Sequence, residues 1–363
     1  MYDIIIIGGG IGGSASALRA AQNGMTAIWI LGSKKNRKRS RSQWVMDLGN
    51  IVGFHEGIIK NQVIKTLKKH KQDDAIAFLE NEHYHINNRM LIQNTVQRIE
   101  KDYPDIKIIE GEASILQKTE FGFSIRTGEE IISGNSVVLS TGVMDEQPHI
   151  LKQNKKGEWE KTPKWIYPFA NREQILYCIR CEGHLTKEDF VAVIGHSNTS
   201  AELAMMLHER YNNKVFILTN GTEIKISKDK MKILQKYEVD IISNSITGLT
   251  SAGVKQLHGF EFDTHESITV KFALVSLGLH RVYNKLARDL DARLMDEDQA
   301  EEKRHVWINH KGETSVTGLF AVGDMTKRED EPMMKQVYTA QEYAVRAVDT
   351  IDFRRRKMMR ESI

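Results

Sequence analysis

The sequence predicts an α/β protein with two similar strand–loop–helix domains. Two observations carry this prediction. A short apolar run, Ile4–Ile7, leads into a glycine-rich turn and a helix, and a second run, Phe190–Ile194, leads into a similar turn and helix. The chain has 363 residues, which is long enough for two domains of ordinary size.

Composition narrows the class of protein. About two fifths of the residues are apolar, which is enough for real cores, and the net charge is only +3. No apolar run is long enough to span a membrane, and Met1-Tyr2-Asp3 leads directly into the first strand without a signal peptide. Two cysteines are too few for a secreted disulfide scaffold. We therefore expect a cytoplasmic protein that does not bind a membrane.

The first turn, Gly8 to Gly13, fits the pattern G-x-G-x-x-G. Gly8 permits the tight turn, Gly10 lets a pyrophosphate approach the backbone, and Gly13 lets helix and strand pack closely. The helix that begins near Gly12 offers free N–H groups to the phosphates. A glycine-rich turn without a ligand is the alternative, but the position between an apolar strand and a helix favours dinucleotide binding.

The second strand, Ala27–Leu31, is followed by Gly32-Ser33, so the acidic residue that often holds a ribose there is missing. The basic stretch Lys34–Arg41 comes next, and we expect a solvated, mobile loop. A surface for an acidic protein or a phosphate is the alternative. No aromatic residues interleave with this stretch, so we expect no nucleic acid partner.

The middle of the chain contains further expected elements. A loop from Asn50 precedes an amphipathic helix at about 58–71, and a β meander runs from 111 to about 139. That meander ends at Ser140-Thr141-Gly142, a small-residue turn. Residues 151–165 are polar, and we interpret them as a linker or surface insertion.

Cys178 and Cys181 are the only cysteines of the chain, and Glu182 follows them. The spacing indicates a redox disulfide, because one thiol can attack a partner while the second closes the ring. Half of a zinc site is one alternative, but there is no second cysteine pair and no His-x₃₋₅-His, so we expect no metal. Two buried apolar cysteines are the other alternative, disfavoured by the charged neighbours Arg180 and Glu182.

The second strand–turn–helix unit has a degenerate loop, with a helix expected to about Tyr211 and a strand at 215–218. Ser197 occupies the place of the second glycine, where its side chain would crowd a pyrophosphate. Thr219–Thr222 contains no arginine for a 2′-phosphate. The candidate residues of this weak second nucleotide loop are Gly195, Ser197, Asn198 and Thr199.

Near the C-terminus, Gly318–Asp324 is a predicted strand that ends in Gly323-Asp324. Lys335-Gln336-Val337 opens a helix expected to end at about residue 350. The basic tail Arg354–Lys357 is expected to be frayed.

The order of these motifs resembles the low-molecular-weight thioredoxin reductases and, more widely, the two-domain flavin disulfide reductases. The resemblance spans about the whole chain and is strongest at Gly8–Gly24, Cys178–Gly183 and Gly318–Asp324. It implies two Rossmann-like domains of the three-layer ββα type and a homodimer. The FAD-binding domain would be discontinuous, 1–145 plus 278–363, and the pyridine-nucleotide-like domain with the cysteine pair would be inserted at 146–277.

The resemblance also implies roles for single residues. Cys181 would exchange electrons with the flavin, Cys178 would attack the partner disulfide, and Glu182 would donate and accept a proton. Glu182 is one methylene longer than the usual Asp. Asp324 would bind the ribityl or pyrophosphate region, and Gln336 would lie along the flavin ring. The full set expected to hold FAD is Gly8, Gly10, Gly12, Gly13, Asn50, Thr141, Gly142, Gly323, Asp324, Lys335, Gln336 and Val337.

The implied function is an FAD-dependent disulfide oxidoreductase that passes electrons through Cys178 and Cys181 to a thioredoxin-like protein or a small-molecule disulfide. The electron donor, NADPH or NADH, stays open, because the loop at Gly195 departs from the family's Gly-x-Gly-x-x-Ala and no His-Arg-Arg cluster follows. A ferredoxin-dependent reductase or an oxygen-dependent dithiol oxidase of the same fold is the first alternative. A non-catalytic FAD-binding sensor or interaction protein, with Lys34–Arg41 as its contact surface, is the second.

Overall fold

The computed structural model describes residues 1–37, 40–45, 50–51, 58–76, 87–252, 256–330 and 335–363. Two compact units divide the chain. Unit 1 comprises Met1–Gln43, Ile51–Met144 and Arg281–Ile363, and unit 2 comprises Trp44–Asn50 and Asp145–His280. The contacts therefore place the main boundaries near 144 and 280. They also assign to unit 2 a short segment, Trp44–Asn50, that the sequence analysis had placed in the first domain.

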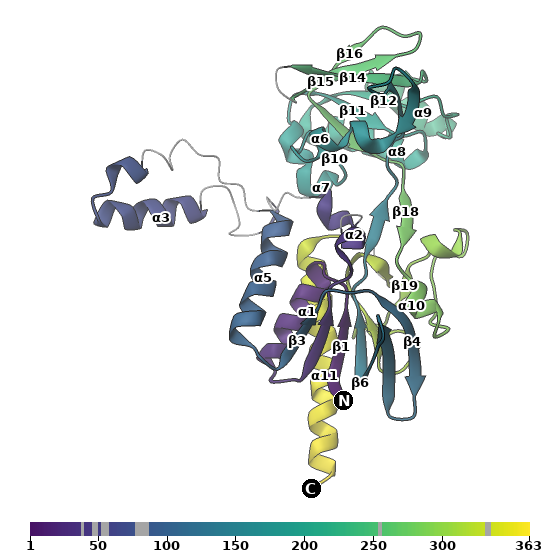
Figure 1. Cartoon of the computed structure of the whole chain (residues 1–363). Coiled ribbons are helices and arrows are strands. Elements are labelled where there is room, and N and C mark those ends of the chain that lie inside the picture. The colour runs from purple at the N-terminus through teal and green to yellow at the C-terminus, as the bar shows by residue number, and fades with distance from the viewer. Residues whose placement is uncertain (38–39, 46–49, 52–57, 77–86, 253–255, 331–334) are drawn as a thin grey trace. The chain divides into compact units, whose positions relative to one another are not determined.

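Unit 1 is built on a parallel sheet with the strand order β3-β2-β1-β6-β20. Figure 1 labels β1, β3 and β6 of this sheet. The first half of β6 pairs instead with β5, which pairs with β4, and this forms the expected antiparallel meander. The apolar run of β1 is continuous because its residues Ile4–Ile7 are buried, as in strands covered on both faces. The strands are β1 (Tyr2–Ile7), β2 (Ala27–Ile30), β3 (Ile106–Ile109), β4 (Ala113–Thr119), β5 (Gly122–Thr127), β6 (Glu130–Leu139) and β20 (Leu319–Ala321).

Three helices of unit 1 pack together against Ile4, Ile6 and Val138 of this sheet: α1 (Ile11–Gln22), α5 (Asn88–Asp102) and α11 (Val337–Glu361). Alanines on α1 and α11 allow their close approach. The smaller elements of unit 1 are α2 (Lys34–Arg37), η1 (Arg41–Gln43), α3 (Ile58–Lys69), α10 (Lys285–Arg288), η4 (Glu301–Lys303), β19 (Val306–Trp307), η5 (Gly323–Met325) and β21 (Thr326–Lys327).

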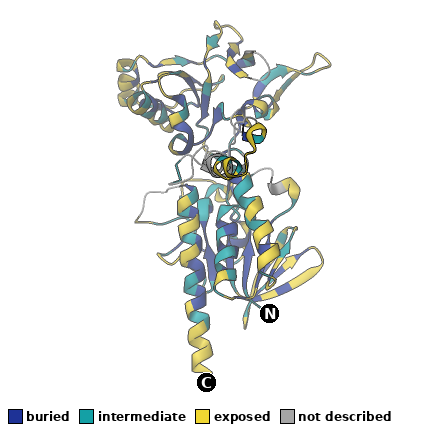
Figure 2. Ribbon diagram, turned by 90° about the vertical axis from the view of Figure 1, so that its left-hand side faces the viewer, coloured by how far each residue is buried: buried dark blue, intermediate teal, exposed yellow. Residues whose placement is uncertain are grey.

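The C-terminal prediction was wrong in its extent. Helix α11 continues to Glu361, and the basic tail lies within it instead of being frayed. Its arginines have carboxylate partners: Arg354 reaches the buried Glu313 with N–O distances of 2.6 and 2.7 Å, and Arg356 reaches Asp352 at 2.8 Å. These ion pairs favour the helix, whose last turns are exposed (Figure 2).

Unit 2 has a five-stranded parallel sheet in the order β10-β17-β11-β12-β13. Helices α8 (Asn198–Tyr211) and α9 (Lys228–Lys236) cover one face, and the antiparallel strands β14 (Ile246–Ala252), β15 (Gln256–Phe262) and β16 (Ile268–Thr269) lie on the other. The parallel strands are β10 (Ile175–Leu176), β11 (Phe190–Ile194), β12 (Lys214–Leu218), β13 (Asp240–Ile242) and β17 (Phe272–Val275). This second strand–turn–helix unit confirms the α/β class with two Rossmann-like domains.

The chain passes between the units through β7 (Val143–Asp145) and β18 (Leu279–Val282), which pair with each other. The interval 151–165, interpreted from the sequence as a linker or surface insertion, contains a hairpin of β8 (Ile150–Gln153) and β9 (Trp159–Thr162), followed by η2 (Pro163–Trp165) and α6 (Tyr167–Ala170). The buried Ile150 and Ile166 hold this segment on the core of unit 2. None of the described helices is apolar over a stretch that would cross a bilayer.

Candidate active site

Cys178 and Cys181 form a disulfide bond at the start of α7 (Ile179–Glu182), which η3 (Gly183–Thr186) follows. Cys178 is the N-cap residue, and the backbone N–H of Cys181 donates to its Sγ at 3.3 Å. One helical turn brings these two side chains together, as the spacing predicts. The same N–H would stabilise a thiolate on Cys178 after reduction. Both cysteines are buried in the core of unit 2.

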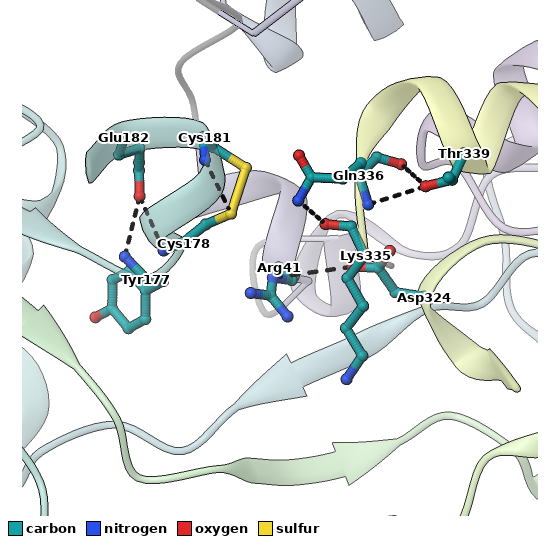
Figure 3. The surroundings of a disulfide bond; sticks show 9 residues. All are labelled: Arg41, Tyr177, Cys178, Cys181, Glu182, Asp324, Lys335, Gln336 and Thr339. Carbon is teal, nitrogen blue, oxygen red and sulfur yellow. Dashed lines mark hydrogen bonds and ion pairs between the residues drawn. A yellow bond between two sulfur atoms is a disulfide. The ribbon is translucent and has the colours of Figure 1, made fainter. Parts of the chain in front are cut away.

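Glu182 holds the backbone of this turn (Figure 3). Its Oε2 accepts hydrogen bonds from the N–H of Tyr177 at 3.0 Å and the N–H of Cys178 at 3.1 Å. The side chain is only 1% exposed. The carboxylate therefore orients the residues on the N-terminal side of the disulfide, a contact that the sequence did not reveal.

Tyr177 and Trp44 form an aromatic group next to the cysteine pair. The Tyr177 phenol donates to Gln147 Oε1 at 2.6 Å, and burial raises the pKa of Tyr177 well above its ordinary value, so this hydroxyl stays protonated. The Trp44 ring lies 4.9 Å from that of Tyr167 and 6.2 Å from that of Tyr177, between centroids. The sequence did not reveal these residues, since their chain positions are far apart and only the fold brings them together.

In unit 1 the first glycine loop has the shape of a phosphate cradle. Gly8 adopts a φ of +123°, and a Cβ on Gly13 would overlap the Gly8 carbonyl oxygen. A Cβ on Gly10, in contrast, would meet no atom within 4 Å. Gly10 is the N-cap of α1, and no side-chain cap accepts from the first N–H groups of this twelve-residue helix. The residues therefore fit a dinucleotide pyrophosphate.

Other residues predicted to hold FAD lie at the carboxyl ends of the neighbouring strands β1, β6 and β20. A Cβ on Gly12 would lie 3.1 Å from Val322 Cγ2, which places the first loop beside the Gly323-Asp324 turn. Gly142 and Gly323 both have positive φ, of +71° and +76°. The Thr141 hydroxyl donates to the Tyr283 carbonyl at 2.6 Å, so it supports the turn.

At the start of α11, Gln336 is buried and its N–H donates to Thr339 Oγ1 at 3.1 Å, while its Nε2 donates to the Lys335 carbonyl at 2.7 Å (Figure 3). Val337 begins the helix. Asp324 lies 3.9 Å from the Arg41 guanidinium. Arg41 lies in η1 and has this carboxylate partner, and Lys34 and Lys35 lie in α2. The basic stretch expected to be a loop therefore contains helical turns at both ends of its described part.

One predicted flavin contact, Asn50, is assigned to the other unit. Asn50 belongs to unit 2 by its contacts, so it is not grouped with the glycine loop. The loop that follows it, residues 52–57, lies outside the described residues.

A carboxylate does lie at the end of β2, although the sequence analysis found none there. The Ser33 hydroxyl donates to Glu112, which enters from the turn between β3 and β4. Because β3 pairs with β2, residues just beyond β3 come to lie beside Ser33. Glu112 could have been identified as this acidic residue only if the order of β2 and β3 in the sheet had been known.

Comparison with known proteins decides the family. Residues 2–344 match the family model described as pyridine nucleotide-disulphide oxidoreductase. The chain belongs to this family. It is 25% identical over 339 residues to an alkyl hydroperoxide reductase protein of Escherichia coli, covering 90% of this chain and 53% of that protein. It is 22% identical over 363 residues to the thioredoxin reductase of Aquifex aeolicus, covering 97% and 93%.

Solved structures agree on the fold of this pyridine nucleotide-disulphide oxidoreductase. The thioredoxin reductase of Streptococcus pyogenes superposes with a TM-score of 0.71 at 17% identity, covering 97% of both chains. That of Giardia duodenalis gives 0.68 at 15% identity, again covering 97% of both. The chain spans about half the length of the alkyl hydroperoxide reductase and NADH dehydrogenase relatives that it matches, at 53%. The expected resemblance to the thioredoxin reductase-like members of this family is thus confirmed.

The second nucleotide loop of this oxidoreductase is partly filled by its own side chains. The Ser197 N–H donates to Ser200 Oγ at 3.3 Å, and that hydroxyl donates to the Ser276 carbonyl at 3.1 Å. Asn198 Oδ1 accepts from the Ser227 N–H at 2.8 Å, while Thr199 is exposed. Gly195 has no room for a Cβ beside Ser200. The loop keeps the strand–turn–helix geometry. Its Ser200 hydroxyl, however, accepts from a backbone N–H and fills space, whereas the space beside Gly10 in the first loop is empty.

The side chain of Asn220, just after β12, already has backbone hydrogen-bond partners. Its side chain donates to the His149 carbonyl at 3.0 Å and accepts from the Ile246 N–H at 2.9 Å. Residues 219–222 also contain no lysine or arginine that could bind a 2′-phosphate.

Proposed function

We propose that this protein is an FAD-dependent disulfide oxidoreductase of the thioredoxin reductase type. Its dithiol, Cys178 and Cys181, would reduce a disulfide in a thioredoxin-like protein or a small molecule. The observation that carries the proposal is the intramolecular disulfide between the only two cysteines of the chain. We further propose, from the resemblance, that the chain is a cytoplasmic homodimer in which unit 1 is the FAD domain and unit 2 the inserted one.

The exchange at the cysteines can be written from the residues present. In the reduced state the Cys178 thiolate attacks one sulfur of the partner disulfide, whose S–S bond breaks and releases one partner thiolate. The Cys181 thiolate then attacks Cys178 Sγ, reforms the intramolecular disulfide and releases the second partner thiolate. Two electrons pass to the partner, which takes up two protons. The Cys181 N–H stabilises the attacking thiolate, and Glu182 holds the backbone of Cys178 and is proposed to exchange a proton with the dithiol.

FAD would be held by unit 1, and when bound it supplies a two-electron carrier that can reduce the disulfide. The N–H groups after Gly10 would bind its pyrophosphate, and the pair Ser33–Glu112 would accept the hydroxyls of its adenosine ribose. Asp324 and Gln336 are proposed to bind the ribityl chain and the ring. Asp324 also lies 3.9 Å from the Arg41 guanidinium, so Arg41 would lie close to the bound ribityl chain.

We propose two alternative electron donors, a pyridine nucleotide or a donor that does not bind at the second loop. Family membership supports NADPH or NADH, whereas the serine contacts inside the second loop support a donor that does not use this loop. Ferredoxin, or a dithiol with oxygen as the final acceptor, would be such a route.

The deciding experiment is an anaerobic titration of the purified protein with NADPH and then NADH, following the absorbance of the oxidised flavin. Bleaching at near-stoichiometric nucleotide is expected for a pyridine-nucleotide-driven reductase. Bleaching only with dithiols or reduced ferredoxin would move the assignment to the second route. A protein that binds FAD, yet is bleached by none of these reductants, would overturn the enzymatic proposal and leave a flavin-binding sensor.

A second experiment tests the roles of the two cysteines. Cys181→Ser should accumulate a mixed disulfide through Cys178 when it is incubated with an oxidised thioredoxin, and mass spectrometry would detect the adduct. Cys178→Ser is the matched control and should accumulate none. The absence of any adduct in both variants would argue against exchange with thioredoxin.

A further inference from the structure

The hairpin β8–β9 of unit 2 carries a concentration of positive charge that the proposed chemistry does not use. Residues 150–164 contain five lysines and two glutamates. Lys164 pairs with Glu160 at 3.8 Å, and Lys152 lies 5.1 Å from the centre of the Trp165 ring. Within the described part of the chain, Lys155, Lys156 and Lys161 are exposed and make no ion pair. Three cations are therefore available to a partner.

An exposed indole lies among these lysines. Trp159 is 59% exposed, although tryptophan is usually buried more deeply. It is two residues from Lys161 on the same strand, so both side chains point to the same face of the hairpin. Tryptophan is enriched among the residues that contribute most to protein–protein binding.

The hairpin is ordered before any partner arrives. Asn154 Oδ1 accepts hydrogen bonds from the N–H groups of Lys156 at 2.8 Å and Glu158 at 3.1 Å, which fixes the turn. The Asn154 N–H donates to the Glu158 carbonyl at 2.8 Å. Ile150, at the base, is fully buried. Binding would lose little conformational entropy, because the surface is already fixed.

The base of the hairpin is also tied to the redox disulfide. Gln147, three residues before β8, accepts the hydrogen bond of Tyr177, the residue that precedes Cys178. Ile150 belongs to the same core cluster as both cysteines. Hairpin and disulfide are thus parts of one packed unit, and next to the disulfide Arg180 and His184 are exposed and add basic character.

We propose that the hairpin Ile150–Thr162 is a docking surface for a protein substrate with an acidic face, which the Cys178–Cys181 dithiol then reduces. The inference rests on the proposed function and adds to it the class of partner. Trp159 would be covered by the partner, and Lys155, Lys156 and Lys161 would face its carboxylates. A small neutral disulfide would react at the same dithiol without touching the hairpin.

The test compares two substrates on the full-length protein, reduced with dithiothreitol and freed of it by gel filtration. The first substrate is an oxidised, acidic thioredoxin, and the second is the neutral 2-hydroxyethyl disulfide. The hairpin variant is Lys155→Glu/Lys156→Glu/Lys161→Glu. The matched control is Lys228→Glu/Lys232→Glu/Lys236→Glu, three exposed lysines on α9 of the same unit. Trp159→Ala tests the indole separately.

We expect the hairpin variant to reduce the acidic thioredoxin about tenfold more slowly or worse, with a weakened dependence on salt. Trp159→Ala should also be slower, with its salt dependence kept. All variants should reduce 2-hydroxyethyl disulfide at the wild-type rate, which also shows that they are folded.

Equal rates of wild type and hairpin variant with thioredoxin would overturn the docking proposal and leave the proposed function standing. A similar slowing in the α9 control would also overturn it, because the effect would then come from overall charge. A wild-type protein that reduces neither substrate would remove the proposed function itself.

Discussion

The sequence and the structure indicate different roles for Glu182. Its position after Cys181 suggests an acid–base group, and its contacts in the structure are two backbone N–H donors on the other side of the disulfide. The pairing could not be read from the sequence, because it depends on how the backbone of Tyr177 and Cys178 turns into α7. The cysteine pair itself could, since one helical turn closes that spacing.

Replacing Glu182 tests this structural role. Glu182→Ala removes two charge-assisted hydrogen bonds to buried N–H groups, so we expect a loss of about 2 to 4 kcal/mol in the free energy of unfolding. Glu182→Gln keeps an oxygen acceptor and should lose less. Urea denaturation at neutral pH measures both, and equal stability of Glu182→Ala and wild type would contradict the assignment.

His305 makes the stability of unit 1 depend on pH. Burial lowers the pKa of His305 to about 4, with Lys335 adding to the shift, although its Nδ1 lies 2.7 Å from Asp296. Lys327 also contacts Asp296, and the hydrogen bonds from Lys327 and His305 lower the pKa of Asp296. The folded state thus resists protonation of His305, whereas the unfolded chain takes up a proton near pH 6.5.

Stability from this site is therefore full above about pH 6.5 and is lost as the pH falls toward 4. Between pH 7 and pH 5 we expect His305 to account for a loss of about 2 kcal/mol in the free energy of unfolding. Urea denaturation of wild type and His305→Asn at both pH values measures this loss. The variant should show a smaller decrease, and an identical decrease in both proteins would exclude His305 as the cause.

At the scale of elements, the strands and helices with strong periodicity were predicted well. The strand Phe190–Ile194 has the predicted bounds, and the helix after it ends at Tyr211, as expected. The tail of α11 and the hairpin at 151–165 were predicted poorly, because long-range contacts stabilise both. Arg354 forms an ion pair with Glu313, which precedes β20, and Ile150 packs in the core of unit 2. Neither partner is near in sequence.

The N-terminus of α1 offers a test at the scale of one element. A Cβ at Gly10 meets no protein atom, whereas a Cβ at Gly13 overlaps the Gly8 carbonyl. Gly10→Ala should therefore fold with wild-type stability yet bind FAD at least about tenfold more weakly, because its methyl group occupies the space of the pyrophosphate. Gly13→Ala should be destabilised even without FAD.

Flavin fluorescence during titration of the apoprotein gives the FAD affinity, and thermal unfolding of the same apoprotein gives the stability. Unchanged FAD affinity in a stable Gly10→Ala protein would mean that the pyrophosphate does not lie at this loop.

At the scale of the whole molecule, the two-unit organisation follows from the repeated strand–turn–helix pattern. The family resemblance implied domain boundaries at 145 and 278, and the contacts divide the chain near 144 and 280. The excursion of Trp44–Asn50 into unit 2 is not. Nothing in the local sequence distinguishes it from a surface loop, since the rings that receive Trp44 come from residues more than a hundred positions later.

Trp44 should contribute to the stability of unit 2, although it precedes the main segment of that unit by a hundred residues. Trp44→Ala removes ring contacts with Tyr167 and Tyr177, and we expect unit 2 to lose about 2 to 4 kcal/mol. Trp159→Ala is a matched control, because that exposed indole contributes little to folding. Scanning calorimetry of both variants measures the effect, and equal transitions for the two would contradict this role.

The same excursion affects how the protein can be recombined. Unit 2 looks like a contiguous cassette, 145–280, that could be moved between flavoproteins by exchanging one stretch of gene. The cassette is incomplete, because two residues of its core cluster, Trp44 and Val45, come from a segment a hundred residues earlier. A chimera that receives 145–280 alone would have a hole against Tyr167 and Tyr177, and the donor chain would keep an indole with no place to pack. Successful grafts would have to carry both segments together, and natural exchange of this unit would be constrained in the same way.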